Sequence, residues 1–407
     1  MAASSTATAL HPLHRLWRLF PAQERRRLLA RATSVLAPRP DAVPPPASGG
    51  VAVAGELSRA SGLGEVARLM LRGLARLDIP SWALDVGTAV SGAAPTALPP
   101  RGAPLLLHVN APFLPLALLR MSRAALRGRR VIGYWAWELP VVPPDWRAGV
   151  PFVHEAWVLS RFTAAAVEPL LPGRVRVVTP PVAVAPPEPS ALDRAAFGLP
   201  EAAVVVLVSF SLASSLERKN PLQAIAAFRA AFGARPDRVL VLKVGNPGDF
   251  PADFERLRAA VADAPNIRLE TRLLPPRDSH ALTGAADIVL SLHRSEGFGL
   301  IPAEAMLLGK PVIATGWSGN MDFMDNDTGA LVGYRLIPAR DPRGVFEAPG
   351  AVWADPDQAD AVAQLRRLAD DAAGRAALGA RAREAATRRL GTESLAAALR
   401  SIGLLAP

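Results

Sequence analysis

The chain has 407 residues, which is too long for one compact core and predicts two domains of about 150 to 200 residues each. Half of the residues are hydrophobic and a fifth are charged, as in globular rather than disordered proteins. The absence of cysteine excludes disulfides and thiolate metal sites, and the six histidines form no H-x-x-x-H pair, so we expect no metal site.

The N-terminal part of the chain, residues 1–48, is a basic extension. The net charge is +10, and the first 50 residues supply half of it, with seven arginines against two acids. We predict helix over 13–36, broken near Pro21, which either lies on an anionic membrane surface, packs on the body of the protein or is disordered. Basic and aromatic residues do not interleave further along, so we expect no nucleic-acid partner.

No signal peptide is visible, and no apolar stretch is both long and uninterrupted enough to span a bilayer. We therefore expect a cytoplasmic protein, with peripheral contact to the inner face of the membrane if the extension binds it.

A first domain is predicted over 49–185, after the Pro-rich linker APRPDAVPPPASGG. Its expected strands lie at 51–55, 81–87, 104–110, 129–137, 155–160 and 174–182, and its expected helices at 62–77, 116–128 and 163–171. Strands that alternate with helices predict a parallel sheet with right-handed crossovers.

The Pro-rich stretch PPVAVAPPEPS predicts a boundary, followed by a second domain over 186–385 and a C-terminal helix over 386–407 that crosses back to the first domain. Expected strands lie at 202–212, 238–245, 267–270, 286–293 and 311–315, with helices between them and over 358–405. The predicted fold is therefore α/β, with two Rossmann-like parallel-sheet domains facing across a cleft that binds a ligand at the carboxyl ends of the strands.

The stretch RSEGFGLIPAEAM (294–306) holds Glu296 and Glu304 with seven residues between them. It is predicted as the end of a strand, a glycine turn and a helix that begins at Pro302 and ends before Gly309, which puts Glu304 in the first helical turn. Carboxylates on both sides of such a turn suit the hydroxyls of a sugar or ribose. Alternatively, Glu304 compensates the helix dipole and the turn is an ordinary one.

Only three of the 46 basic residues are lysines: Lys219, Lys243 and Lys310. Lys219, with Arg218 beside it, follows one predicted strand of the second sheet, and Lys243 ends the next. Cations at this sheet edge, next to a glycine turn, predict a diphosphate clamp. Solvated surface cations are the alternative.

The sequence E-G-F-G-L-x-x-x-E, followed by GKPVIATGWSGN, resembles the retaining glycosyltransferases of the group-1 (family-4) type, which have the GT-B fold. GLGEVAR (62–68), ERKNP and VLKVG are similar to other stretches of that family, and IGYWAWELP and EAWVLSRF to a subgroup that acts in cell-surface polysaccharide assembly. The resemblance covers about residues 50–400.

The resemblance implies that Arg218 and Lys219 neutralise the donor diphosphate, that Glu296 acts near the reacting carbon and that Glu304 binds the ribose. The remaining implied donor contacts are Gly62, Gly64, Lys243, Gly297, Phe298, Gly299, Leu300, Ser318, Gly319 and Asn320. The stretch SFSLASS lacks the arginine that is usual in the family, and YWAWE stands where a histidine is often seen. The acceptor-side candidates are therefore His108, Asn110, Trp135, Trp137 and Glu138; His108 and Asn110 would equally suit a buried hydrogen-bonded pair.

The expected function is transfer of a hexose, with retention, from a nucleotide-diphosphate sugar to a glycan or lipid-linked acceptor, with no cofactor and no metal. A nucleotide-sugar epimerase and a non-catalytic scaffold of the same fold are the alternatives. GLGEVA with Asp85 imitates a dinucleotide fingerprint, but ELSRAS separates its first glycine from the strand. The sequence DND (325–327) imitates a metal-binding motif and is expected to form a polar turn.

Overall fold

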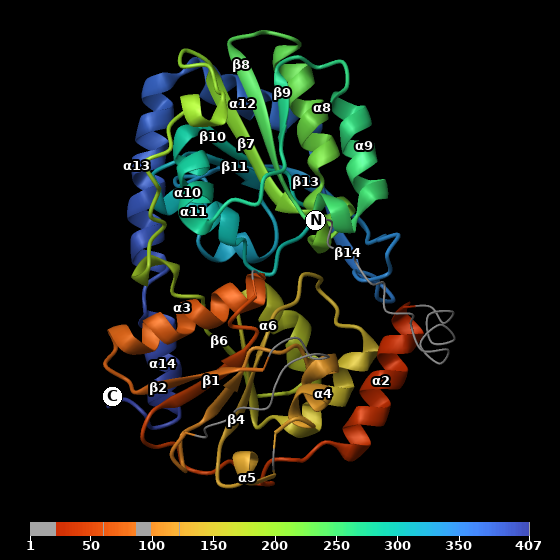
Figure 1. Ribbon diagram of the computed structural model, residues 1–407, viewed down its shortest axis with the longest axis vertical. Helices are drawn as coiled ribbons and strands as arrows, with labels where there is room; N and C mark the ends of the chain where they lie inside the picture. The colour runs from red at the N-terminus through yellow and green to blue at the C-terminus, as the bar shows by residue number, and fades with distance from the viewer. Residues whose placement is uncertain (1–21, 60, 87–98, 122, 407) are drawn as a thin grey trace, which may run out of the picture.

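The computed structural model describes residues 22–59, 61–86, 99–121 and 123–406. Within these residues the chain forms two lobes, each built on a six-stranded sheet, that lie one above the other in Figure 1. The described part of the N-terminal extension is helix α2 (Ala22–Leu36), and the predicted helical residues 13–21 lie outside the described residues. Each described helix is too short or too polar to cross a bilayer.

The lower lobe in Figure 1 contains a parallel sheet in the order β2-β1-β3-β4-β5-β6. The strands are β1 (Val51–Gly55), β2 (Ser81–Asp85), β3 (Leu105–Leu107), β4 (Val131–Trp135), β5 (Glu155–Val158) and β6 (Val175–Val177). The helices are α3 (Gly62–Arg76), α4 (Leu114–Leu118), α5 (Arg123–Leu126) and α6 (Arg161–Val167). The single helix predicted over 116–128 is therefore wrong, since α4 and α5 are separate short helices.

The upper lobe contains a second parallel sheet in the order β12-β11-β10-β7-β8-β9. Its strands are β7 (Val204–Ser211), β8 (Arg238–Gly245), β9 (Ile267–Glu270), β10 (Ile288–Ser291), β11 (Val312–Thr315) and β12 (Ala330–Val332). Its helices are α7 (Leu216–Lys219), α8 (Pro221–Phe232), α9 (Pro251–Val261), α10 (Pro276–Ala285), α11 (Leu300–Leu307), α12 (Gln358–Asp370) and α13 (Ala372–Arg389). The prediction of two parallel-sheet α/β domains is confirmed.

The chain returns to the first lobe at its C-terminal end, where α13 leads into α14 (Glu393–Ser401) beside α3 (Figure 1). Leu395 of α14 and Pro181 both come within 2.9 Å of the position that a Cβ on Gly73 of α3 would occupy. Glycine at this position therefore lets α14 and the segment after β6 pack closely on α3. The domain boundaries expected near residues 185 and 385 stay predictions.

An antiparallel hairpin, β13 (Tyr334–Pro338) and β14 (Val352–Pro356), is inserted between β12 and α12 and was not predicted. Its loop reaches the first lobe, because Phe346 and Trp353 belong to the same hydrophobic cluster as Trp137 and Trp146. Tyr334 and Leu336, in contrast, are exposed, so the buried side of the hairpin lies toward its loop and β14. The hairpin thereby connects the second lobe to the first at the waist of the molecule.

Candidate active site

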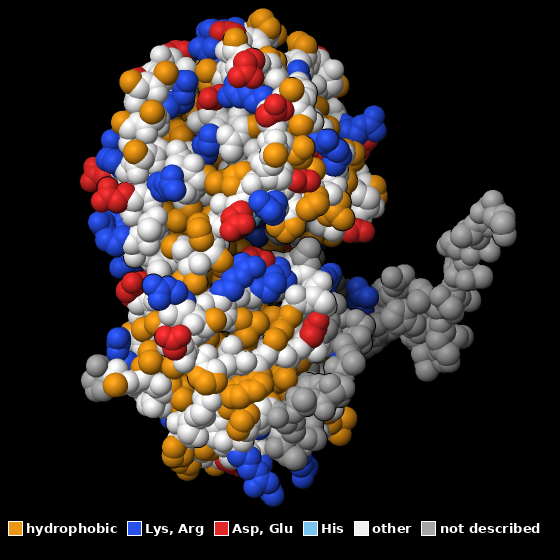
Figure 2. Space-filling model, turned by 60° about the vertical axis from the view of Figure 1, so that its left-hand side comes forward, with side chains coloured by type: hydrophobic (Ala, Val, Ile, Leu, Met, Phe, Trp, Pro, Cys, Tyr) orange, Lys and Arg blue, Asp and Glu red, His pale blue; other side chains and the backbone are white. Residues whose placement is uncertain are grey.

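A cavity of about 480 Å³ lies between the two lobes, at the carboxyl ends of the strands of the second sheet. Both lobes line this cavity. The first lobe contributes Glu56, Ser61, Gly62, Leu63, Val66, Asn110, Ala136, Glu138 and Leu159. The second lobe contributes residues 208–211, Ser214, Arg218, Lys219, Leu290, Ser291 and residues 296–302. Lys and Arg side chains gather at the waist on the face shown in Figure 2. This is the place where two facing α/β domains bind a ligand.

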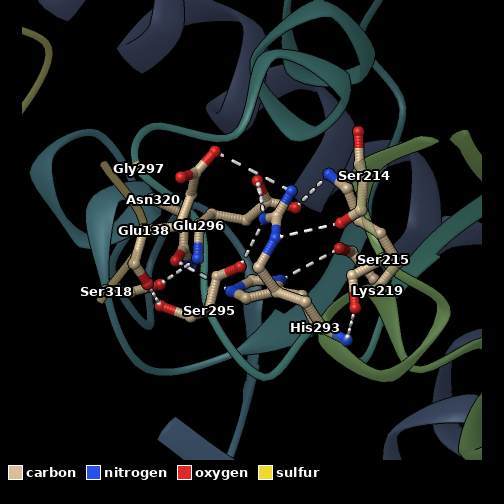
Figure 3. Close-up of polar contacts among 12 residues, drawn as sticks. Glu138, Ser214, Ser215, Lys219, His293, Ser295, Glu296, Gly297, Ser318 and Asn320 are labelled. Carbon is tan, nitrogen blue, oxygen red and sulfur yellow. Dashed lines mark hydrogen bonds and ion pairs between the residues drawn. The ribbon is translucent and has the colours of Figure 1, made fainter. Parts of the chain in front are cut away.

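Glu296 lies in the loop after β10 and is 7% exposed. Its two carboxylate oxygens meet different cations: Oε2 is 3.1 Å from Nη1 of Arg218, and Oε1 accepts a hydrogen bond from Nζ of Lys219 (Figure 3). Burial would raise the pKa of Glu296, but the charges of Lys219 and Arg218 outweigh it and lower the pKa to about 2. The carboxylate is therefore ionised throughout the physiological range.

The two cations are carried by the one-turn helix α7. Ser215 precedes this helix with a φ of +74°, and its Oγ accepts a hydrogen bond from the backbone N–H of Arg218 at 3.3 Å. Burial lowers the pKa of Lys219, although Glu296 opposes this shift. The strained Ser215 turn thus sends Arg218 and Lys219 together into the cleft.

Arg218 is 3% exposed, and its guanidinium is held on several sides. Nη1 donates to the backbone oxygen of Ser295 at 2.7 Å, Nε donates to that of Ser214 at 3.2 Å, and Nη2 lies 3.9 Å from Oε1 of Glu138. Burial raises the pKa of Glu138, and Arg218 opposes the rise. Arg218 therefore orients Glu296 and Glu138, while Lys219 is the more accessible of the two cations.

The glycine turn 297–299 packs against both lobes. A Cβ on Gly297 would come within 2.8 Å of the backbone oxygen of Trp137, and one on Gly319 would come within 2.2 Å of the backbone oxygen of Gly297. Ser160 of the first lobe also donates a hydrogen bond to that Gly297 oxygen, at 2.6 Å. These close approaches explain why glycine is required at position 297 in the turn and at position 319 in the neighbouring loop.

Helix α11 follows this turn directly, with Gly299 at a φ of +102° before Leu300. The backbone N–H groups at the start of α11 consequently border the cavity, where an anion is favoured. The prediction that the helix begins at Pro302 is wrong, since Pro302 is its third residue. Gly309, at a φ of +71°, follows the end of the helix as predicted.

Glu304 is the fifth residue of α11, so its predicted place in the first turn is also wrong. The left-handed conformation of Gly299 starts the helix two residues earlier than the proline suggests. The side chain is half-buried and lies near Glu65 of α3, in the other lobe. Burial, together with the negative charge of Glu65, raises the pKa of Glu304 to about 8.

His293 is a site residue that the sequence reasoning missed, although it stands two residues after β10, just before the motif. The ring is buried; Nε2 lies 3.1 Å from Oδ1 of Asn320, and Nδ1 lies 3.0 Å from Oγ of Ser291. Burial lowers the pKa of His293, so the ring is neutral at pH 7. Asn320 in turn donates to the backbone oxygen of Thr315, at 3.0 Å. Asn320, which was expected to contact the donor, thus supports the loop behind Glu296.

The loop 318–320 holds the backbone of Glu296 from both directions. The N–H of Glu296 donates to Oγ of Ser318 at 2.9 Å, and the N–H of Gly319 donates to the backbone oxygen of Glu296 at 2.9 Å. This predicted segment therefore holds the backbone of Glu296 rather than its carboxylate.

Lys243 is not brought to this cluster. Its Nζ donates to the backbone oxygen of Arg272 at 2.9 Å, and the residue is absent from the lining of the cavity. Gly62 lines the cavity, and a Cβ there would meet nothing within 4 Å. Gly64 is required by packing, because its Cβ would come within 2.5 Å of the backbone oxygen of Glu56.

Four of the five acceptor-side candidates separate into two groups, and the fifth, Trp137, stacks on Phe346 of the hairpin loop. Glu138 and Asn110 line the cavity, and the Asn110 side chain exchanges two hydrogen bonds with the backbone of Ala136, at 2.8 and 2.9 Å. His108 and Trp135 are buried away from the cavity. His108 stacks on Tyr134, with ring centroids 4.4 Å apart, and neither of its ring nitrogens has a hydrogen-bond partner among the described residues.

The hairpin contributes two residues that the sequence reasoning missed. The Phe346 ring contacts both the Trp137 ring, with centroids 5.8 Å apart, and the Arg218 guanidinium. Asp341 is 2% exposed; it accepts a hydrogen bond from Oγ of Ser215 at 3.1 Å and others from backbone N–H groups of its own loop. The hairpin loop therefore supports both ends of helix α7.

Comparison with known proteins shows which families part of the chain resembles. Residues 204–355 match the family model described as Glycosyl transferases group 1. D-inositol 3-phosphate glycosyltransferase of Saccharomonospora viridis is 31% identical over 233 residues, which is 56% of this chain and 51% of that protein. The chain spans about half or less of the length of the curated relatives it matches.

Two solved structures share the fold. HepE of Anabaena, in a complex with UDP and glucose, has a TM-score of 0.59 and 14% identity, covering 87% of this chain and 100% of that one. Sucrose-phosphate synthase of Thermosynechococcus elongatus has a TM-score of 0.62 and 17% identity, covering 87% and 98%. The resemblance to the group-1 glycosyltransferases and the GT-B fold are thereby confirmed.

Proposed function

We propose that the protein transfers a hexose from a nucleotide-diphosphate sugar to a hydroxyl group of a glycan or lipid-linked acceptor, with retention of the anomeric configuration. The observation that carries the proposal is the cluster of Glu296, Lys219 and Arg218 beside the N-terminus of α11, in a cavity between two α/β lobes. A cation and free backbone N–H groups suit the diphosphate, and the carboxylate suits sugar hydroxyls.

In the proposed reaction, the bond between the anomeric carbon and the diphosphate oxygen breaks, and its electron pair stays on that oxygen. Lys219, held in place by Glu296, and the N–H groups at the start of α11 stabilise the charge that develops there. The acceptor oxygen then forms the new bond to the anomeric carbon, and its proton passes to the departing diphosphate. These groups supply positive charge without a metal, so we propose that none is needed.

Glu304 is proposed to bind the ribose of the nucleotide. Its raised pKa means that it is largely protonated below pH 8, so it both donates and accepts hydrogen bonds. Leu300 and the glycines of the turn lie between Glu296 and Glu304, where the amides of 297–300 would contact the donor. Ser318 and Gly319 would act indirectly, through the backbone of Glu296.

A role in cell-surface polysaccharide synthesis rests on the likeness of IGYWAWELP and EAWVLSRF to one subgroup. The cytoplasmic location likewise stays a prediction. So does the contact of the N-terminal extension with a membrane, because residues 1–21 lie outside the described part of the chain.

The test is incubation of the protein with UDP- and GDP-sugars and a mixture of glycan acceptors, with and without EDTA. We expect release of nucleoside diphosphate and a new glycoside of unchanged anomeric configuration by NMR, with loss of at least about 100-fold in Glu296→Gln. Glu255→Gln, an exposed carboxylate on α9, is the matched control and should retain full activity.

Other outcomes separate the alternatives. Interconversion of the donor sugar without release of nucleoside diphosphate would indicate an epimerase, and binding of nucleotide without any turnover would indicate a scaffold. Either result contradicts the proposed transfer. If EDTA abolishes the release of nucleoside diphosphate, the proposal that no metal is needed is contradicted.

A further inference from the structure

Buried hydrogen bonds join the two lobes beside the glycine turn of the candidate active site. Ser160, just before helix α6, is fully buried, and its Oγ donates to the backbone oxygen of Gly297 at 2.6 Å. Oγ1 of Thr163, which is equally buried, lies 3.4 Å from the same oxygen. Ser295 of the second lobe donates in the opposite direction, to the backbone oxygen of Glu138. Both lobes therefore supply donors and acceptors to this contact, away from solvent.

Arg161 continues the contact toward the surface. Its backbone N–H donates to Oδ2 of Asp322 at 2.8 Å, and its Nε lies 3.2 Å from Oδ1 of the same carboxylate. The Asp322 side chain is 12% exposed, so this contact is less screened by water than an ordinary surface ion pair. Asp322 ends the turn Gly319–Asp322, whose first residue holds the backbone of Glu296. The first lobe thus reaches both loops that carry or support the glutamate.

Apolar packing surrounds these hydrogen bonds. One hydrophobic cluster contains Leu159 of the first lobe together with Phe298 and Met306 of the second, and another contains Trp137 together with Phe346. Relative motion is the usual expectation for two domains of one chain, unless their interface is large and hydrophobic. Separation of these lobes would expose apolar side chains of both clusters to water. The interface therefore favours one fixed arrangement of the lobes.

The candidate donor cavity is already present between lobes that are in contact. Its volume of about 480 Å³ lies in the range of about 300–1,000 Å³ that is usual for small-ligand sites. Glu138 and Leu159 of the first lobe and Gly297 and Phe298 of the second line it together. Closure of open lobes is consequently not required to assemble the cavity. A shift of the first lobe would instead disturb it, because Ser160 holds the residue that follows Glu296.

We propose that the two lobes stay docked throughout the reaction, and that Ser160 and Asp322 are positioning residues that keep them so. The hydroxyl group of Ser160 fixes the turn on which the carboxylate of Glu296 depends, and Asp322 fixes the loop behind it. The effect on catalysis rests on the proposed function, whereas the docking of the lobes does not.

The first measurement is a distance between the lobes. The chain has no cysteine, so spin labels can be attached to two introduced ones. Ala75→Cys on α3 and Ala259→Cys on α9 give one exposed position on each lobe (Figure 1). Double electron–electron resonance should give one narrow distance that changes by less than about 2 Å when UDP or GDP is added. A second population in the free protein, or a shift of more than about 2 Å with either nucleotide, would overturn the proposal.

The second measurement uses the variant that combines Ser160→Ala with Asp322→Ala, which removes hydrogen bonds between the lobes. We expect a second, broader distance population. We also expect kcat of transfer to fall about 10- to 100-fold, because a displacement of about 1 Å can cost that much. The Kd of the nucleoside diphosphate should change less than kcat. If the double variant does not fold, Ser160→Ala alone should show the same changes to a smaller extent.

Asp357→Ala is the matched control. Asp357 caps helix α12 within the second lobe, as Ser160 caps α6, so this variant loses a helix cap without losing a bond between the lobes. It should keep the wild-type distance and the wild-type kcat. Equal distances and equal kcat in the Ser160 variant and in Asp357→Ala would overturn the positioning role.

The distance measurement needs no activity, so this inference and the proposed function can fail separately. A single narrow distance in a protein that binds neither UDP nor GDP would support the docked lobes and contradict the proposed transferase. Transfer activity together with a distance that changes on addition of nucleotide would support the transferase and overturn the docked lobes.

Discussion

The ring of Phe346 lies 4.8 Å from the guanidinium carbon of Arg218, so a residue of the β13–β14 hairpin covers the cation that holds Glu296. The same ring stacks on Trp137 of the first lobe. This arrangement connects the two lobes through one aromatic side chain at the edge of the candidate active site. It also makes Phe346 a positioning residue, since its ring contacts the cation rather than the reacting atoms.

Replacement of Phe346 by leucine should reduce kcat. A cation–π contact of a buried arginine contributes about 0.5–2 kcal/mol, which corresponds to roughly 2- to 30-fold in rate if the contact is lost in the transition state. The Kd of the nucleoside diphosphate should change less than kcat. Phe346→Tyr keeps the ring and serves as the control, and equal activity of the Leu and Tyr variants would contradict the role assigned to the ring.

Replacement of Gly319 by alanine should disturb the glutamate loop. The new Cβ would come within 2.2 Å of the backbone oxygen of Gly297, so one of the two loops must shift, at a cost of about 1–3 kcal/mol of stability. We expect at least about a tenfold loss of kcat, because Gly319 also holds the backbone oxygen of Glu296. Thermal unfolding and initial rates measure both effects.

Gly248→Ala is the matched control for this change. Gly248 is exposed and a Cβ there would meet nothing within 4 Å, so the variant should be as stable as the wild type or slightly more stable. A Gly319→Ala variant that is indistinguishable from Gly248→Ala in stability and rate would show that the close approach of the two loops has no consequence.

The raised pKa of Glu304 predicts a stability that falls as the pH rises. The unfolded chain releases this proton near pH 4.5, whereas the folded protein keeps it up to about pH 8, so the folded state loses stability between these values. From pH 6 to pH 8 the loss from this one group is about 2 kcal/mol. Glu304→Gln should remove it, and urea denaturation at the two pH values measures the difference.

Glu65→Gln tests the cause of that shift. It removes the neighbouring negative charge, so the pH-dependent loss should become smaller without disappearing, because burial is the larger cause. If the free energy of unfolding of wild type and Glu304→Gln changes in parallel from pH 6 to pH 8, the carboxyl group does not titrate in this range.

His108 should make the folded protein sensitive to mild acid. Burial lowers the pKa of His108 to about 3, whereas the unfolded chain binds the proton near pH 6.5, so stability is lost as the pH falls through this interval. Between pH 7 and pH 5 the loss is about 2 kcal/mol. His108→Phe keeps the stacking on Tyr134 and removes two buried nitrogens without partners, so it should be at least as stable at pH 7 and lose less at pH 5.

The comparison for His108 is a chemical denaturation series at pH 7, 6 and 5. An equal loss in wild type and His108→Phe would place the acid sensitivity elsewhere. A large loss of transfer activity in His108→Phe at pH 7 would instead restore His108 as a residue of the acceptor site.

Much of the molecule could be predicted because its signals are local. Continuous apolar runs such as VVVLVSFS, followed by polar loops and amphipathic helices, predict parallel strands, and parallel strands bring their carboxyl ends to one edge. For this reason the sequence alone was sufficient to place Glu296 and the Arg218–Lys219 pair at the same cleft. The hairpin was missed because its two strands are separated by a loop of 13 residues, 339–351, which is far longer than the two- to five-residue turns that signal a hairpin in a sequence.

The sequence by itself determined the two α/β domains, the glycine turn between two glutamates and the edge of the sheet at which the cations lie. The reason is that hydrophobic patterns and the alternation of strands with helices determine the course of the backbone. Only the tertiary structure decided where the side chains point. Lys219 reaches Glu296, whereas Lys243 at the same edge turns to the backbone of Arg272. The reason is that such directions depend on contacts between distant segments, such as Asp341 with Ser215 and Phe346 with Arg218, which no local pattern encodes.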